Sequence, residues 1–179
     1  MSGITLAIDF ETANYPRESA IALGISVIDG NDVAETRAWL FKPVPDPRFD
    51  PSRIYIRRDF IDIHGITSKM LKDKPYFDGV WEEMRPYFES ADRLVAHNAG
   101  FDRSVLGAVA AHYNIPLKAY HWQCTVNLSR VAWPGLYNHK LSTVAEHLGI
   151  ALNHHDAASD AHACARIFIE TQKQACEAA

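Results

Sequence analysis

The chain has 179 residues, 47% of them hydrophobic and 22% charged, which suits one domain with a sizeable apolar core. A net charge of −4 excludes a protein that coats polyanions with a uniformly basic surface, although metal ions bound at an acidic site would still permit a nucleic-acid enzyme. The sequence lacks a secretory leader and a bilayer-spanning run, and its three cysteines lack metal-ligand spacing. We therefore expect one cytoplasmic domain over residues 1–179, without membrane contact.

Three strands are predicted near the start of the chain. Apolar and polar or small side chains alternate over residues 4–11, which is the period of a strand and places Asp9 and Glu11 on one face. Residues 19–28 and 33–42 also have strand character, with a turn-prone Asp-Gly-Asn-Asp segment between them. Together these segments predict an antiparallel meander.

The remainder predicts a loop followed by helices and strands. Residues 42–62 are rich in proline and arginine and predict an extended, irregular surface loop. Apolar spacing then predicts a helix over 77–88, a strand over 93–97, a helix over 101–113, a strand over 120–124 with helical turns after it, and helices over 141–148 and 156–176. This order predicts an α/β fold whose mixed sheet has helices on both faces.

Four carboxylates lie in three separated segments. Asp9 and Glu11 share a strand face and offer the hard oxygen ligands that magnesium prefers, although a solvated strand end explains them equally well. Asp102 and Asp160 fall in the first turns of predicted helices, where a carboxylate also stabilises the helix N-terminus. Buried together, the four would repel one another unless cations compensated them. The set therefore predicts a divalent-metal site.

A histidine beside this set is the candidate proton acceptor. His155 precedes Asp160 by five residues, which places both on one side of the start of the last helix. An imidazole accepts a proton near neutral pH. We interpret His154 and His162 as surface or packing residues, and Asp156 as a helix cap.

Four motifs in order resemble the DEDDh class of 3′-to-5′ exonucleases, whose members include the proofreading epsilon subunit of bacterial DNA polymerase III, ribonuclease T and oligoribonuclease. The motifs are Asp9-Phe10-Glu11-Thr12, Ile63-His64-Gly65-Ile66, His97-Asn98-Ala99-Gly100-Phe101-Asp102 and His155-Asp156-Ala157-Ala158-Ser159-Asp160. The resemblance implies a ribonuclease H-like fold, with a five-stranded mixed sheet and the acids gathered at its centre. A sister class has tyrosine where this chain has Asp156, which favours the histidine class.

The resemblance also implies roles at two divalent cations, Mg²⁺ or Mn²⁺. Asp9 would bridge both ions. Glu11 and Asp160 would hold the ion that carries the attacking water, and Asp102 would act on the second ion through water. His155 would be the general base.

The substrate side is implied less completely. Thr12 and His64 would hold the terminal nucleotide, and His97 is a further candidate, although His64 and His97 also suit structural polar roles. Phe10, Tyr15 and Phe101 are the aromatic candidates near the site, and the strand pattern places Phe10 in the core.

We therefore expect a 3′-to-5′ exonuclease that releases nucleoside 5′-monophosphates from the 3′ end of single-stranded nucleic acid, with DNA favoured. An exoribonuclease acting on RNA ends or short oligoribonucleotides is the alternative within the class, because no residue identifies a contact to a 2′-hydroxyl. A nucleic-acid-binding module without turnover is another alternative. A zinc hydrolase built on the histidine-rich segment is a third, but the spacing there differs from that of a zinc-binding helix. The sequence leaves the oligomeric state open.

Three arginines in the predicted loop have two interpretations. Arg53, Arg57 and Arg58 either contact the phosphates of the entering strand or form a solvated basic loop.

Overall fold

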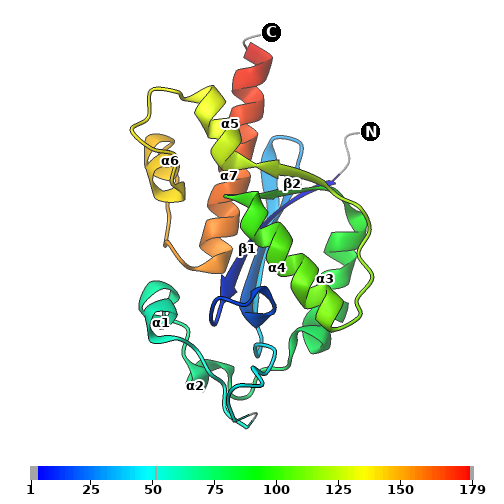
Figure 1. Ribbon diagram of the computed structural model, residues 1–179. Helices are drawn as coiled ribbons and strands as arrows, with labels where there is room; N and C mark the ends of the chain where they lie inside the picture. Colours follow the sequence, from blue (N-terminus) through cyan, green and yellow to red (C-terminus); the bar gives the residue numbers. More distant parts are fainter. Residues whose placement is uncertain (1–3, 51, 178–179) are drawn as a thin grey trace.

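A twisted five-stranded sheet lies between layers of helices in the computed structural model, which describes residues 4–50 and 52–177 (Figure 1). The strand order is β3-β2-β1-β4-β5. The strands are β1 (Ile4–Thr12), β2 (Ala20–Asp29), β3 (Asp32–Leu40), β4 (Ala91–Ala96) and β5 (His121–Cys124). Neighbours among β1, β2 and β3 pair antiparallel, whereas β4 pairs parallel with both β1 and β5. The predicted meander and mixed sheet are confirmed.

Seven α-helices are found in the described part of the chain. They are α1 (Arg58–His64), α2 (Ser68–Leu71), α3 (Phe77–Ser90), α4 (Ala99–His112), α5 (Thr125–Ala132), α6 (Leu141–His147) and α7 (Ala157–Glu177). The helices predicted from apolar spacing correspond to α3, α4, α6 and α7, and the helical turns expected after the last strand form α5. Within residues 4–50 and 52–177, none of them has both the length and the apolar character needed to cross a membrane.

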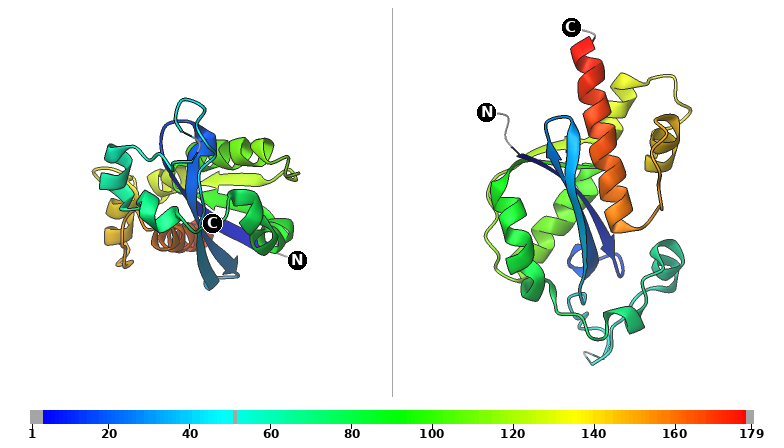
Figure 2. Two further views of the ribbon diagram at one scale, coloured as in Figure 1. Left: turned by 90° about the horizontal axis from the view of Figure 1, so that it is seen from below. Right: turned by 180° about the vertical axis from the view of Figure 1, so that it is seen from behind.

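β1 is the central strand of the sheet, and its side chains are buried on both faces. Leu6 and Ile8 belong to the larger core, which β1 forms with α3 and α4. Ala7 points to the opposite face and packs with residues of α7, so helices cover both faces, as Figure 2 shows from two directions. Asp9 and Glu11 continue the alternation of Ala7 and are therefore directed to the α7 side.

The prediction of an irregular loop over residues 42–62 is wrong at its end, because the last five residues belong to α1. This helix is too short for a hydrophobic period to be recognised. It is stabilised locally by an ion pair between Arg58 and Asp62 one turn apart, with Nε and Oδ1 at 3.0 Å. Gly65 ends it in a left-handed conformation, with φ of 72°. Pro51, part of the same predicted loop, lies outside the described residues.

A close backbone contact fixes α7 against the sheet. Gly24 of β2 is paired with Asp9 of β1. A Cβ atom at Gly24 would lie 1.8 Å from the carbonyl oxygen of Ala157, so no residue larger than glycine fits without moving the helix. The first turn of α7, which carries Asp160, is therefore held directly over the strand that carries Asp9.

Replacing Gly24 with alanine is expected to lower the free energy of unfolding by about 1–3 kcal/mol, because the added methyl group must push α7 off the sheet. Gly107→Ala is the matched control. Gly107 lies inside α4, and a Cβ there would meet no atom within 4 Å, so this change should stabilise by roughly 0.5–1 kcal/mol. Thermal unfolding of the two variants checks the contact, and equal effects of the two changes would contradict it.

Candidate active site

All nine residues that the sequence predicts for the site line one hollow, at the carboxyl ends of β1 and β4. The hollow has a volume of about 270 Å³. The nine residues are Asp9, Phe10, Glu11, Thr12, His64, His97, Asp102, His155 and Asp160. They come from β1, α1, the turn after β4, α4 and the start of α7, so the fold unites segments that are far apart in sequence.

Three carboxylates offer ligand atoms to a common point. One oxygen each from Asp9, Glu11 and Asp160 lies within 4.8 Å of the other two. Oδ2 of Asp160 accepts two hydrogen bonds, from the backbone N–H of His155 and from Nδ1 of His154, each at 3.0 Å. Oδ1 of Asp160 is buried and has no hydrogen-bond partner among the described residues. An orphaned buried oxygen beside two other carboxylates suits a cation.

Asp102 reaches the site from α4. It lies in the first turn of this helix and is buried. Its Oδ1 accepts a hydrogen bond from the backbone N–H of Phe10 at 3.0 Å, so the carboxylate ties α4 to the middle of the active-site strand. Asp156 has the capping role that the sequence predicts, because its Oδ1 accepts the N–H of Ser159 at 2.9 Å.

The electrostatics of the cluster favour bound positive charge. Burial, and then the neighbouring carboxylates, raise the pKa of Asp9 well above its ordinary value and that of Glu11 to about 8. Burial raises the pKa of Asp102 to about 7 and also raises that of Asp160, although hydrogen bonds partly oppose the rise in both. A cation would offset this repulsion and return the carboxyl groups to their ionised forms.

His155 lies at the rim of the cluster with the properties of a base. Its backbone is left-handed, with φ of 69°, which lets its N–H turn back to Asp160. Within residues 4–50 and 52–177 its ring nitrogens make no hydrogen bond, and the ring stacks on that of His154 with centroids 3.8 Å apart. Burial, followed by the neighbouring His154, lowers the pKa of His155, so its imidazole is neutral and able to accept a proton near pH 7.

The other two histidines of the hollow are fixed by hydrogen bonds within the protein. His64 donates from Nε2 to the carbonyl oxygen of Thr12 at 3.3 Å and accepts the N–H of Ile66 on Nδ1 at 3.0 Å. His97 donates from Nε2 to the carbonyl oxygen of His139 at 3.0 Å and accepts the hydroxyl of Thr125 on Nδ1 at 2.9 Å.

The side chains of the remaining predicted substrate residues are largely enclosed. Thr12 is buried, and Phe10 packs in the core beneath the site, as the strand pattern predicts. Burial lowers the pKa of His97 to about 4, so this ring is neutral near pH 7. Its two hydrogen bonds within the protein give it a structural role. Among the described residues, Oδ1 of Asp160 and the ring nitrogens of His155 are therefore groups of the hollow that have no hydrogen-bond partner within the protein.

Sequence reasoning missed several residues that line the hollow. His154 is exposed, as the sequence predicts, but its ring also bonds Asp160, a contact that the sequence did not indicate. Phe60 comes from α1, the short helix that the sequence does not reveal, and Leu141 comes from the start of α6. Ile63 also lines the hollow, although it was singled out in the sequence only as part of the Ile63-His64-Gly65-Ile66 motif. This motif, whose first two residues end α1, was the available signal for the helix.

Ionisation of Glu11 and Asp102 is expected to reduce the stability of metal-free protein as the pH rises from about 4 to about 8. The raised pKa values of Glu11 and Asp102 mean that the folded state holds protons more tightly than the unfolded state, so the stabilisation is present at low pH and is lost as these groups ionise. With a chelator present, the Tm of the wild-type protein should fall by roughly 5 °C or more over this range relative to that of Glu11→Gln, and Mg²⁺ should restore it. The lowered pKa of His97 acts in the opposite direction, but equally in both proteins. Glu11→Gln should flatten the dependence, and an identical pH profile in that variant would contradict this electrostatic account.

Comparisons with known proteins agree with this arrangement. The RNase_T family model, described as Exonuclease, matches residues 6–168. Exodeoxyribonuclease 10 of Escherichia coli strain K12 is 30% identical over 168 residues, which cover 91% of this chain and 66% of that protein. The chain thus spans about two thirds of the length of this curated relative.

Solved exonuclease structures share the fold. Exonuclease X in complex with 5′-overhanging duplex DNA has a TM-score of 0.71 at 23% identity, covering 94% of this chain and 91% of that one. The nuclease domain of 3′hExo, a DEDDh family member bound to rAMP, has a TM-score of 0.73 at 17% identity, covering 98% and 94%. The ribonuclease H-like fold implied by the four motifs is confirmed, and the chain belongs to the RNase_T family of exonucleases.

Proposed function

We propose that this protein is a metal-dependent 3′-to-5′ exonuclease that hydrolyses the terminal phosphodiester bond of a single strand and releases a nucleoside 5′-monophosphate. The observation that carries the proposal is the convergence of Asp9, Glu11 and Asp160, with the orphaned Oδ1 of Asp160, beside the unbonded ring of His155. Family membership supports hydrolysis of nucleic acid from an end. The 3′-to-5′ direction follows from the DEDDh pattern.

The donor set fits two divalent cations, Mg²⁺ or Mn²⁺. All four ligands are carboxylates, which are the hard donors that these ions prefer. Asp9, Glu11 and Asp160 would hold one ion, and Asp9 and Asp102 would hold the second, with water between Asp102 and the ion. When bound, such ions supply activated water and stabilise negative charge on the phosphate and the leaving oxygen.

The chain's own groups would position the reactants and move the proton. His155 would take a proton from the attacking water onto a ring nitrogen, as its neutral state allows. The new bond forms between the water oxygen and phosphorus, the bond to the 3′ oxygen breaks, and that oxygen is protonated as it leaves. Because both hydrogen bonds to the Asp160 carboxylate go to Oδ2, its Oδ1 would be available to a cation.

The apolar walls of the hollow would receive the terminal base. Phe60, Ile63 and Leu141 line one part of it, and Phe101 lines another beneath the guanidinium of Arg17, which lies 4.6 Å from the centre of that ring. Aromatic and apolar faces stack on any base, so weak sequence preference is expected. We infer that His64 orients the rim of this pocket and that His97 is structural, because both ring nitrogens of each are already bonded.

We favour DNA as the substrate because the matched curated relative is named an exodeoxyribonuclease. RNA ends or short oligoribonucleotides are the second candidate, since a DEDDh structure with the same fold was solved with rAMP. We further propose that residues 1–179 act as one domain and work in the cytoplasm, where the free thiols of Cys124, Cys164 and Cys176 would stay reduced.

Incubation of end-labelled single-stranded DNA with Mg²⁺ tests the activity. A 5′ label should show stepwise shortening, with nucleoside 5′-monophosphates as the small product. A chelator and Asp9→Asn should each abolish it, since Asp9 is the proposed bridging ligand. Digestion of a matched RNA strand under the same conditions decides between the two substrates. Binding of the strand without release of mononucleotides would contradict the proposal.

Replacement of the adjacent residues His154 and His155 should have different effects on the reaction rate and on Mg²⁺ binding. His155→Ala is expected to lower kcat by roughly 10²–10⁴ while Mg²⁺ still raises Tm. His154→Ala should instead raise the Mg²⁺ concentration needed for half-maximal rate and for the Tm shift by roughly 10-fold, with kcat recovered at saturating Mg²⁺. A large loss of kcat in His154→Ala at saturating metal, or normal kcat in His155→Ala, would contradict this division of roles.

A further inference from the structure

A second hollow lies beside the active site, between the turn that follows β1 and the proline-rich segment 42–57. It has a volume of about 460 Å³. Its lining consists of Asn14, Tyr15, Pro16, Arg48, Phe49, Tyr55 and Arg57. Three aromatic rings and two arginines thus line it, and no acidic residue does. We call it the upstream hollow.

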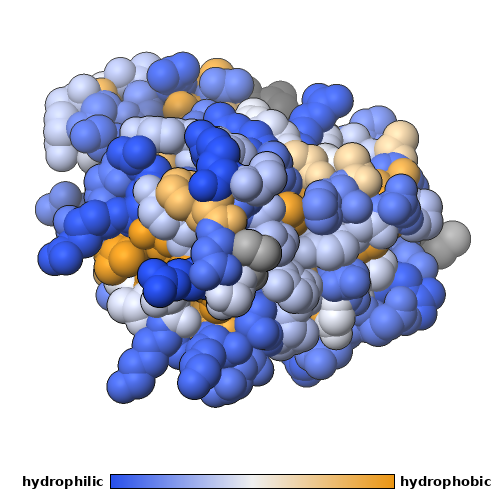
Figure 3. All heavy atoms as spheres, turned by 60° about the horizontal axis from the view of Figure 1, so that its bottom comes forward, coloured by the Kyte–Doolittle hydropathy of each residue, from blue (hydrophilic) through white to orange (hydrophobic). Residues whose placement is uncertain are grey.

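The three aromatic side chains of the upstream hollow are exposed to solvent, although aromatic rings that only stabilise a fold are usually buried. Tyr15 is 66% exposed, Phe49 39% and Tyr55 37%. Phe49 and Tyr55 stack on each other with centroids 3.9 Å apart and their planes at 19°, which closes the loop on itself and leaves an outer aromatic face. Figure 3 looks toward this end of the molecule and shows apolar patches exposed among hydrophilic residues.

Each arginine of the hollow lies against one of these rings. The guanidinium carbon of Arg57 is 4.5 Å from the centre of the Tyr15 ring, and that of Arg48 is 5.8 Å from the centre of the Phe49 ring. Each arginine also forms a bidentate pair with a carboxylate, Arg57 with Asp59 and Arg48 with Asp46. Both arginine side chains stay partly exposed in these pairs, 68% for Arg48 and 37% for Arg57, so each guanidinium has N–H groups left to donate to a phosphate.

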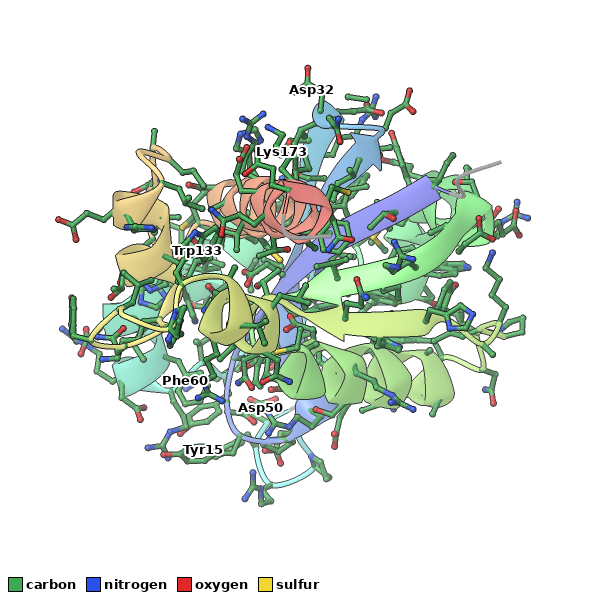
Figure 4. All side chains as sticks on the ribbon, turned by 90° about the horizontal axis from the view of Figure 1, so that it is seen from above. Tyr15, Asp32, Asp50, Phe60, Trp133 and Lys173 are labelled. Atoms are coloured by element: carbon green, nitrogen blue, oxygen red, sulfur yellow. The ribbon has the colours of Figure 1, made fainter. Side chains whose placement is uncertain are left out.

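The upstream hollow adjoins the active-site hollow, because a residue that lines one contacts a residue that lines the other. The ring of Tyr15 meets that of Phe60 edge to face, with centroids 5.4 Å apart, and Figure 4 labels both residues on the same side of the molecule. Phe60 in turn lines the active-site hollow. The backbone also connects the two walls, because the N–H of Arg57 donates to the carbonyl oxygen of Ala13 at 3.0 Å.

We propose that the upstream hollow binds the nucleotides that precede the scissile bond in a single strand of nucleic acid, with bases stacked on Tyr15 and on the Phe49–Tyr55 pair and phosphates held by Arg48 and Arg57. The proposal rests on the exonuclease function proposed above. Alternating aromatic faces and guanidinium groups are the chemistry that binds single strands without regard to sequence. Of the loop arginines singled out in the sequence, Arg57 has this role, whereas Arg53 and Arg58 do not line the hollow.

Substrates of different length separate this hollow from the catalytic site. The p-nitrophenyl ester of thymidine 5′-monophosphate occupies only the active site, whereas a strand of about twelve nucleotides also reaches the upstream hollow. Tyr55→Ala should raise KM for the strand by roughly 10-fold and leave hydrolysis of the ester unchanged. Arg48→Ala should raise the same KM and weaken its dependence on salt, because one phosphate contact is lost.

Two variants outside the hollow serve as matched controls. Arg85→Ala removes an arginine that is likewise paired with carboxylates, and Tyr137→Ala removes a tyrosine that is 84% exposed. Neither should change KM for the strand. An unchanged KM in both Tyr55→Ala and Arg48→Ala, or equal losses on the strand and the ester, would overturn the upstream hollow. A wild-type protein that cleaves neither substrate would instead overturn the exonuclease function itself.

Discussion

Repulsion among Asp9, Glu11, Asp102 and Asp160 is the constraint on which the rest of the site depends. Their burial raises the pKa of every one of them, and at Asp9 and Glu11 the neighbouring charges raise it further. Such a cluster is unfavourable in a protein without cations. It is stable in the ionised form only when positive charge is bound among the carboxylates, which is the condition that two-metal hydrolysis requires.

The fold meets this constraint with rigid contacts rather than with flexible loops. Gly24 lets the start of α7 lie on the sheet, and the hydrogen bond from Phe10 to Asp102 ties α4 to the same strand. Hydrogen bonds from the backbone of His155 and from the ring of His154 fix Asp160. The carboxylates are thus held in place before a metal binds, while the proposed substrate contacts lie on α1 and on the loop over 42–57.

Helices and strands with long hydrophobic patterns could be predicted from the sequence, whereas the short helix α1 could not. The alternation over β1 and the apolar spacing of α3 and α7 extend over many residues. These elements could therefore be predicted, as could the common face of Asp9 and Glu11, but the order of the strands in the sheet could not. The helix α1 has seven residues and gave no readable period. The contact of His154 with Asp160 depends on a positive φ at His155, which no local pattern reveals. The upstream hollow forms where the turn after β1 packs against the segment 42–57, a tertiary contact that also has no sequence signature.

Calorimetric titration of the chelator-treated protein with Mg²⁺, in buffers of different ionisation enthalpy, tests the central claim most directly. Because Glu11 and Asp102 have pKa values of about 8 and about 7 without metal, and the pKa of Asp9 is raised well above its ordinary value, binding near neutral pH should release at least about one proton per protein. The release should be smaller in Glu11→Gln, because that variant lacks one of the groups that would lose a proton. Saturating Mg²⁺ binding with a heat that does not depend on the buffer, or no Mg²⁺ binding at all, would contradict a carboxylate cluster that exists to hold cations.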